Sequence, residues 1–328
     1  MIKRSAYSVA ALAGVLIGGC AQQTTTYPVV KGNDSYVRGA LAYQEGDRDR
    51  AVEALQAAVQ ENPDLIMARF LLGTIHKEKG RYEAAVQQFQ RVVELDPYTY
   101  TNHYNLGLVY HLLDRLQEAA TSYLAALKLN PQDMKSNMYL GLVYTALGKP
   151  QMGLEYAKKA AEIDPQSGEA HANLAVVLDA VKDYPAAELE YRRAIELDSN
   201  RVETLVNLAG NLATQKRFKE AINIYEQVLK NKDSSLLRQR YGYALLGNGQ
   251  PAEAIRAFQA ALKANPRNFQ AMNGLGDALL AQYRDSAMLD EPKRAQAMDY
   301  LKKSLDINPQ QPRIAALIKE YAEGTVFP

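Results

Sequence analysis

The sequence of 328 residues predicts an all-α solenoid of eight helix-turn-helix repeats, closed by a C-terminal capping helix. Three observations predict this fold: segments of about thirty-four residues recur along the chain, small residues return at two fixed places in each segment, and prolines return at a third. A repeat of this length is one supersecondary element that buries its apolar face only by stacking on its neighbours. Residues 100–133 are the typical repeat, with which the other repeats are compared.

Small residues mark the place where the two helices of each repeat should pack most closely. A larger side chain there would wedge two antiparallel helices apart. The position in the first helix holds Gly39, Gly73, Gly107, Gly141, Ala175, Ala209, Gly242 and Gly276, and the position in the second holds Ala51, Ala85, Ala119, Gly153, Ala187, Ala221, Ala254 and Ala297. Because no copy breaks either series, the sequence predicts a helical hairpin in each repeat.

Prolines and glycines predict where the helices end. The residue before a proline is driven out of the helical conformation, so the second helix of a repeat should stop there. The prolines of this series are Pro63, Pro97, Pro131, Pro165, Pro266 and Pro309. Between the two helices of a repeat, a left-handed residue caps the first one. The glycines at that place are Gly46, Gly80, Gly148 and Gly249.

These series resemble the pattern of the tetratricopeptide repeat family. In one repeat the matching residues are Leu106, Gly107, Tyr110, Ala119, Tyr123, Ala126 and Pro131. One departure is that the family often has tryptophan at a position where this chain, which contains none, places residues such as His103. The resemblance implies a right-handed superhelical solenoid whose concave surface is lined by the first helix of each repeat.

The repeats are expected over residues 32–309, followed by a capping helix at 312–323. Their approximate bounds are 32–65, 66–99, 100–133, 134–167, 168–201, 202–234, 235–268 and 269–311. One residue is missing from the spacing near residues 231–235. The last repeat carries about nine extra residues near 283–291, for which we expect a surface loop.

The N-terminus is expected to be a lipoprotein signal peptide over residues 1–19. Two basic residues precede an apolar run at 6–17, which is too short to span a bilayer. The run from Leu16 to Cys20 resembles the lipobox of bacterial lipoproteins. The resemblance implies cleavage before Cys20 and acylation of Cys20, whose sulfur forms a thioether, with palmitate as one of the acyl chains. A plain secretory leader with an incidental cysteine is the alternative.

Residues 20–31 are polar and threonine-rich, and they are expected to form a flexible tether. In the lipoprotein family an aspartate after the acylated cysteine favours retention at the inner membrane, and this chain has Ala21. The resemblance therefore implies an outer-membrane anchor that faces the periplasm, provided that the host has an outer membrane.

Composition argues against several functions. Lys and Arg total 38 and Asp and Glu total 37, so a net charge of +1 argues against nucleic-acid binding. The four histidines, His76, His103, His111 and His171, form no metal-ligand spacing, and a common packing role is expected for the equivalent His103 and His171. Since the repeats occupy almost the whole mature chain, the sequence predicts no enzyme, no metal and no cofactor.

The resemblance implies a partner-binding groove on the first helices. Carried over one position at a time, the groove residues are Tyr36, Tyr43, Phe70, Tyr104, Asn105, Leu108, His111, Leu112, Met138, Tyr139, Leu142, Asn173, Val176, Asp179, Asn207 and Tyr243. Asn105, Asn173 and Asn207 share one repeat position. Each offers a donor and an acceptor, either to an extended peptide or to a neighbouring helix end.

These features predict an envelope scaffold or adaptor that binds a peptide or helix of a protein partner. The resemblance implies a role in assembling an envelope machine such as a pilus and secretin system or a peptidoglycan complex. The alternative is a component of exopolysaccharide export, or glycan binding, because aromatic and asparagine side chains also suit sugar rings. The family's clamp for C-terminal carboxylates is not matched, since Thr74 and Leu108 stand where clamp residues are expected.

Overall fold

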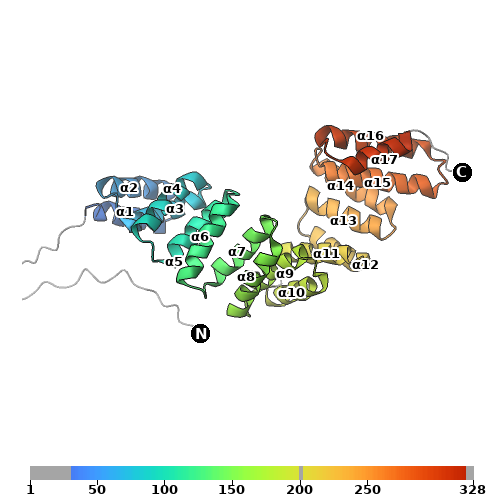
Figure 1. Ribbon diagram of the computed structural model, residues 1–328. Helices are drawn as coiled ribbons and strands as arrows, with labels where there is room; N and C mark the ends of the chain where they lie inside the picture. Colours follow the sequence, from blue (N-terminus) through green and yellow to red (C-terminus); the bar gives the residue numbers. More distant parts are fainter. Residues whose placement is uncertain (1–30, 199–201, 323–328) are drawn as a thin grey trace, which may run out of the picture. The chain divides into compact units, whose positions relative to one another are not determined.

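The structure, a computed structural model, describes residues 31–198 and 202–322. Within these ranges the chain forms seventeen α-helices and no β-strand (Figure 1). The helices are α1 (Asn33–Gln44), α2 (Arg48–Glu61), α3 (Ile66–Glu78), α4 (Tyr82–Leu95), α5 (Tyr100–Leu112), α6 (Leu116–Leu129), α7 (Met134–Ala146), α8 (Pro150–Ile163), α9 (Gly168–Ala180), α10 (Tyr184–Leu197), α11 (Val202–Thr214), α12 (Phe218–Leu229), α13 (Ser235–Gly247), α14 (Pro251–Ala264), α15 (Phe269–Asp285), α16 (Glu291–Ile307) and α17 (Pro312–Ala322). The predicted all-α fold is confirmed.

The described residues divide into two compact units, one that ends at Leu72 and one that begins at Gly73. In the first unit α1 and α2 form a hairpin, and the core residues Ala51 and Leu55 are fully buried. A Cβ atom on Gly39 would lie 2.7 Å from the Leu55 side chain. The glycine therefore allows α1 to approach α2 closely.

In the second unit successive hairpins stack on one another. Helices α5 and α6 form one hairpin, α7 and α8 the next, and α6 also packs against α7, a pattern that continues to α16. A Cβ atom would lie 2.9 Å from the Tyr123 ring at Gly107 and 2.7 Å from the Phe258 ring at Gly242. All eight small residues of the second helices are buried. The close approach predicted from the two series of small residues is confirmed.

The predicted helix ends are also confirmed. Helix α6 ends at Leu129, and Asn130 before the proline is extended with φ −137° and ψ 91°. The four turn glycines have positive φ, between 69° and 84°. At the same turn of other repeats the left-handed residue is not glycine but Asp114, Lys182 or Lys216, with φ from 58° to 67°.

The extra residues of the last repeat lie mostly in helices, not in the surface loop that we expected. Helices α15 and α16 have 17 residues each, against 13 and 14 for α5 and α6. Only residues 286–290 connect them. Tyr283 is buried in the part of α15 that extends beyond the length of α5, and this added packing is a physical reason for the longer helix. Helix α17 then packs against α16 and buries Ile314.

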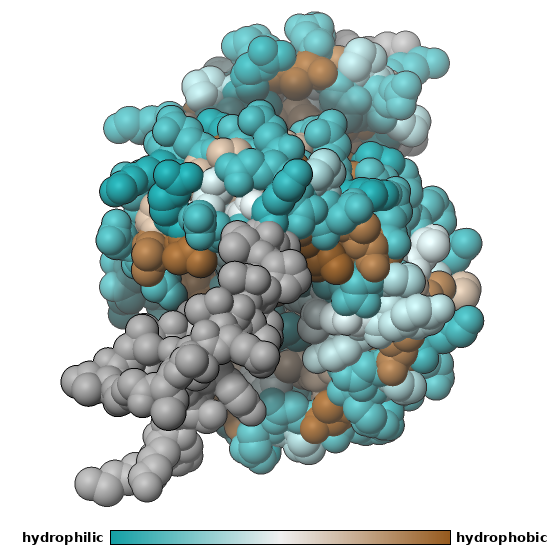
Figure 2. All heavy atoms as spheres, turned by 90° about the vertical axis from the view of Figure 1, so that its left-hand side faces the viewer, coloured by the Kyte–Doolittle hydropathy of each residue, from teal (hydrophilic) through white to brown (hydrophobic). Residues whose placement is uncertain are grey.

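Most of the surface is polar. Figure 2 shows hydrophilic side chains over most of the visible face, with hydrophobic side chains in small separate groups. None of the helices within 31–198 and 202–322 is both long and apolar enough to cross a membrane. The expected signal peptide, Cys20 and nearly all of the tether lie outside the described residues.

Candidate functional site

The predicted groove residues all lie on the first helices of their repeats. The ten that we assigned to partner binding are half-buried: Tyr36 and Tyr43 on α1, Phe70 on α3, Tyr104, Asn105, Leu108 and His111 on α5, Tyr139 on α7, Asn173 on α9, and Asn207 on α11. The first three belong to the N-terminal compact unit, and the other seven belong to the second.

The structure brings Tyr104, His111 and Tyr139 together around Tyr123 of α6. The Tyr139 ring centroid lies 6.1 Å from that of Tyr123 and 6.2 Å from that of Tyr104. His111 meets Tyr139 edge to face at 6.1 Å. Burial lowers the pKa of His111, so its imidazole is neutral at pH 7. This aromatic cluster spans the third and fourth repeats and presents an apolar, uncharged surface.

Met138 does not line the groove, contrary to our prediction, because it is 1% exposed. It lies one helical turn before Gly141, on the side of α7 that packs against α8, so its side chain enters the core. By contrast, Leu112 is 47% exposed at the end of α5.

The three equivalent asparagines behave differently. The Asn105 side chain donates to the backbone oxygen of Thr101 at 2.8 Å, one turn earlier in its own helix. Asn173 and Asn207 make no hydrogen bond with any other described residue. Asn105 therefore bonds within its own helix, neither to a peptide nor to a neighbouring helix end as the two alternatives had it, and the other two amides are available to a partner.

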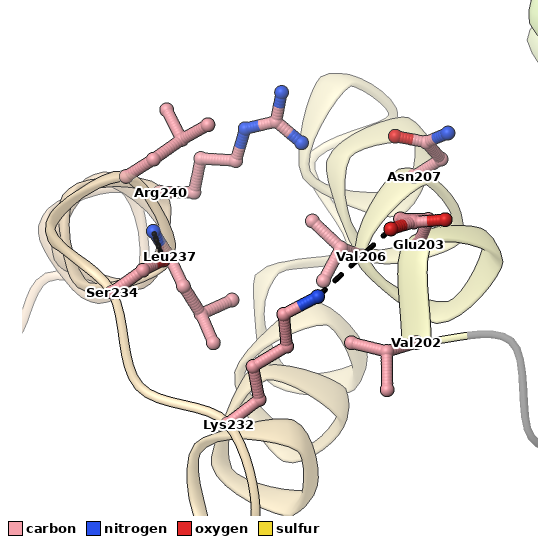
Figure 3. Close-up of a pocket in the computed structure, with 9 residues that line it drawn as sticks. Val202, Glu203, Val206, Asn207, Lys232, Ser234, Leu237 and Arg240 are labelled. Atoms are coloured by element: carbon pink, nitrogen blue, oxygen red, sulfur yellow. Dashed lines mark hydrogen bonds and ion pairs between the residues drawn. The ribbon is translucent and has the colours of Figure 1, made fainter. Parts of the chain in front are cut away.

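Arg240 of α13 was missed in the sequence. Once the one-residue deficit is counted, it occupies the repeat position of Asn173 and Asn207. Figure 3 shows its side chain extending from α13 toward Asn207. Among the described residues Arg240 has no hydrogen bond and no ion pair. The signal that would have found it is its place two residues before Gly242, which matches the place of Asn207 before Ala209.

Two hollows adjoin at Asn207 and Arg240. The smaller, about 270 Å³, lies between α11 and α13 (Figure 3), and its walls include Val202, Val206, Leu236 and Leu237. The larger, about 430 Å³, lies among α9, α11 and α13, and its walls include Val176, Asp179, Gly210, Asn211 and Thr214. One hollow is therefore mainly aliphatic, whereas the other is mainly polar.

Buried hydrogen bonds fix the polar wall. The Tyr191 hydroxyl donates to Asp179 Oδ2 at 2.9 Å, and the Asn211 amide donates to Asp179 Oδ1. Burial raises the pKa of Asp179, whereas these two hydrogen bonds lower it. Burial also raises the pKa of Tyr225, below the same surface, to about 12. These links hold α9, α10 and α11 in a fixed arrangement around the polar hollow.

Two tyrosines at one repeat position are expected to respond oppositely to loss of the hydroxyl. Tyr123 and Tyr191 are both buried, but no described atom bonds the Tyr123 hydroxyl, whereas the Tyr191 hydroxyl binds Asp179. We expect Tyr123→Phe to stabilise the protein by about 1 kcal/mol and Tyr191→Phe to destabilise it by about 2 kcal/mol. Urea unfolding followed by far-UV circular dichroism measures both changes. A loss of stability in Tyr123→Phe would contradict this expectation and would point to a bound water at that hydroxyl.

The predicted packing role of two histidines is confirmed. His103 Nε2 lies 2.8 Å from the carbonyl oxygen of Pro97, and His171 Nε2 lies 3.1 Å from that of Pro165. In both repeats the imidazole thus ties the first helix to the preceding proline turn. The part of the chain that the structure describes contains no group of three or more His, Cys, Asp or Glu side chains able to hold a metal.

Stacked helical hairpins, with the candidate site residues on the first helix of each hairpin, define a helical repeat protein. The sequence matches the tetratricopeptide repeat family over residues 36–100, 80–134, 104–168, 138–202, 201–230 and 242–312. The chain belongs to this family. Its members are generally non-enzymatic scaffolds, and the fold indicates protein–protein interaction as the class of function.

Solved structures agree on the fold. A tetratricopeptide repeat protein from Parabacteroides merdae matches with a TM-score of 0.62 and 18% identity, covering 76% of this chain and 98% of that one. A chain of the APC/C hetero-tetramer Cut9–Hcn1 matches with a TM-score of 0.63 and 14% identity, covering 88% of this chain and 55% of that one. No curated protein sequence matches the chain.

Proposed function

We propose that this protein is a non-enzymatic scaffold of the cell envelope that binds an extended peptide segment of a protein partner. The single observation that carries the peptide-binding proposal is the row formed by Asn173, Asn207 and Arg240. They occupy one position in three consecutive repeats, and none has a hydrogen-bonding partner among the described residues. Polar groups in such a row suit the regularly spaced donors and acceptors of a peptide backbone.

The spacing of the row also suits an extended chain. Packed helices are about 8–10 Å apart, and an extended chain rises about 3.3 Å per residue. Consecutive side chains of the row therefore reach about every third residue of a bound peptide. The aliphatic hollow beside Asn207 offers a place for one apolar side chain of that peptide.

The envelope location rests on the N-terminal sequence. The lipobox resemblance at Cys20 supports a lipid anchor, and Ala21 after it supports the outer membrane facing the periplasm. A lipid-anchored scaffold of this kind would hold a partner during assembly of an envelope machine, such as a pilus and secretin system or a peptidoglycan complex.

Selection from a random peptide library against the full chain tests the peptide-binding proposal. We expect the selected peptides to bind the Asn173→Ala/Asn207→Ala variant about 10- to 30-fold more weakly, because each lost hydrogen bond is worth about 1 kcal/mol. Fluorescence anisotropy with synthetic peptides measures the loss. Asn105→Ala is the matched control, since that amide bonds within its own helix.

Two outcomes would contradict the proposal. Selected peptides that bind the double variant as tightly as the unchanged protein would place the peptide site elsewhere, and failure to select any peptide would contradict peptide binding itself. In the second case, titration of the chain with envelope polysaccharides would test the glycan alternative. Shifts in the NMR signals of Tyr104 and Tyr139 would support it, because their rings form the half-buried aromatic cluster.

A further inference from the structure

Gly210 opens the polar hollow to the surface. In four other repeats the same position holds a larger apolar or aromatic residue: Leu108, Leu142, Val176 and Tyr243. A Cβ atom on Gly210 would meet only the Tyr225 hydroxyl, at 3.8 Å, which is ordinary contact. Packing within the protein therefore does not require glycine here, although glycine inside a helix weakens it. The missing side chain leaves a notch, the Gly210 notch, which another molecule can enter.

Hydrogen-bond donors without acceptors face this notch. Tyr225 is 2% exposed, its hydroxyl points at Gly210, and no described residue bonds it. The Arg240 guanidinium on the rim also lacks a partner among the described residues. A guanidinium offers five N–H donors and no acceptor. The group that would satisfy both residues is rich in acceptors and negatively charged.

The other charges around the two hollows are already engaged. Asp179 accepts from Tyr191 and Asn211 and forms no ion pair with Arg240. In the adjoining hollow, Lys232 lies 3.9 Å from Glu203. Among the described residues that line the two hollows, Arg240 is therefore the cation left without a counter-ion.

We propose that the Gly210 notch receives an internal aspartate or glutamate side chain of the bound peptide, whose carboxylate binds the Arg240 guanidinium and the Tyr225 hydroxyl. This inference rests on the proposed peptide binding. Asn207 and Arg240 line both hollows, so an extended chain seated at the notch can continue into the adjoining aliphatic hollow. An acidic side chain within a peptide fits this arrangement better than a chain end. The aliphatic hollow would hold a neighbouring apolar residue.

A library of short peptides, acetylated and amidated so that both ends are uncharged, tests this inference with the full chain. One position at a time is fixed as Glu, Asp, Gln, Lys or Leu. At one position we expect peptides with Glu or Asp to bind about 10- to 100-fold more tightly than the peptide with Gln. The reason is that hydrogen bonds to a charged group are stronger than those to a neutral one. In Arg240→Gln this preference should fall below about threefold.

Three further variants define the site. Gly210→Leu should remove binding of the acidic peptides while the protein stays folded, since Leu108 and Leu142 occupy the same repeat position. Tyr225→Phe should weaken binding of the acidic peptides about 3- to 10-fold, because the phenol hydroxyl is lost. It should not lower the stability of the protein, since no described residue bonds the Tyr225 hydroxyl. Lys232→Gln is the matched control and should leave the preference for Glu unchanged, because Lys232 is paired with Glu203.

The outcomes separate this inference from the proposed function. Peptides that depend on Asn173 and Asn207 but bind equally with Glu or Gln would overturn the acidic subsite and leave peptide binding intact. A requirement for a free C-terminal carboxylate would also overturn it, because the proposed ligand is an internal side chain. If no peptide binds the full chain, both proposals are wrong.

Discussion

Replacing Gly153 with alanine is expected to destabilise the protein by about 3 kcal/mol, at the upper end of the usual cost of overpacking a core. A Cβ atom there would lie 2.4 Å from the carbonyl oxygen of Gly141 on the facing helix. This neighbour is backbone, so it cannot rotate away as a side chain can. Helices α7 and α8 would have to separate, which would loosen the packing of Met138 and Leu140.

Gly210→Ala is the matched control for this prediction. Both substitutions add one methyl group within a helix, but a Cβ atom on Gly210 has 3.8 Å to its nearest neighbour. Alanine there should stabilise the protein by about 0.5 to 1 kcal/mol, because it lowers the conformational entropy of the unfolded chain. Urea unfolding followed by circular dichroism measures both variants. Equal stability of the two variants would show that α7 and α8 do not meet as closely as described.

The sequence was sufficient for the fold because the rules that set it are local. Glycine or alanine at two positions lets the helices approach, proline ends the second helix, and both signals return with the repeat. The left-handed turns were only partly predictable. Gly46 signals such a turn, but Asp114, Lys182 and Lys216 adopt the same conformation without a glycine to mark it. There the stacking of the repeats determines the backbone conformation, at a local cost.

The candidate site was less predictable, because it depends on which atoms are left without partners. Asn105 and Asn173 have the same residue type and repeat position, yet only Asn105 bonds to its own helix. Arg240 occupies the same repeat position but is not an asparagine, and its lack of a described partner is visible only in the structure. The notch at Gly210 depends on the orientation of Tyr225 beneath it, and periodicity alone does not supply that orientation.

Substituting Cys20 with serine is expected to move the protein almost completely from the membrane fraction to the soluble fraction. The lipobox resemblance implies that the Cys20 thiol carries the anchor. Each buried methylene of an acyl chain contributes about 0.8 kcal/mol, and one chain alone gives only reversible binding. Two or more chains make attachment effectively permanent, so losing all of them has a larger effect than any single contact in the repeats. Fractionation of envelopes followed by immunoblotting measures the change.

Ala21→Asp provides the control, because it leaves the thiol in place. By the same resemblance it should keep the protein in the membrane fraction and shift it from the outer to the inner membrane. If Cys20→Ser stays with the membrane after a carbonate wash, an uncleaved apolar leader holds the protein and the anchor is not at Cys20. If it stays with the membrane only until the wash, the repeats are held by their partner, and groove variants such as Asn173→Ala/Asn207→Ala should release the protein where Cys20→Ser does not.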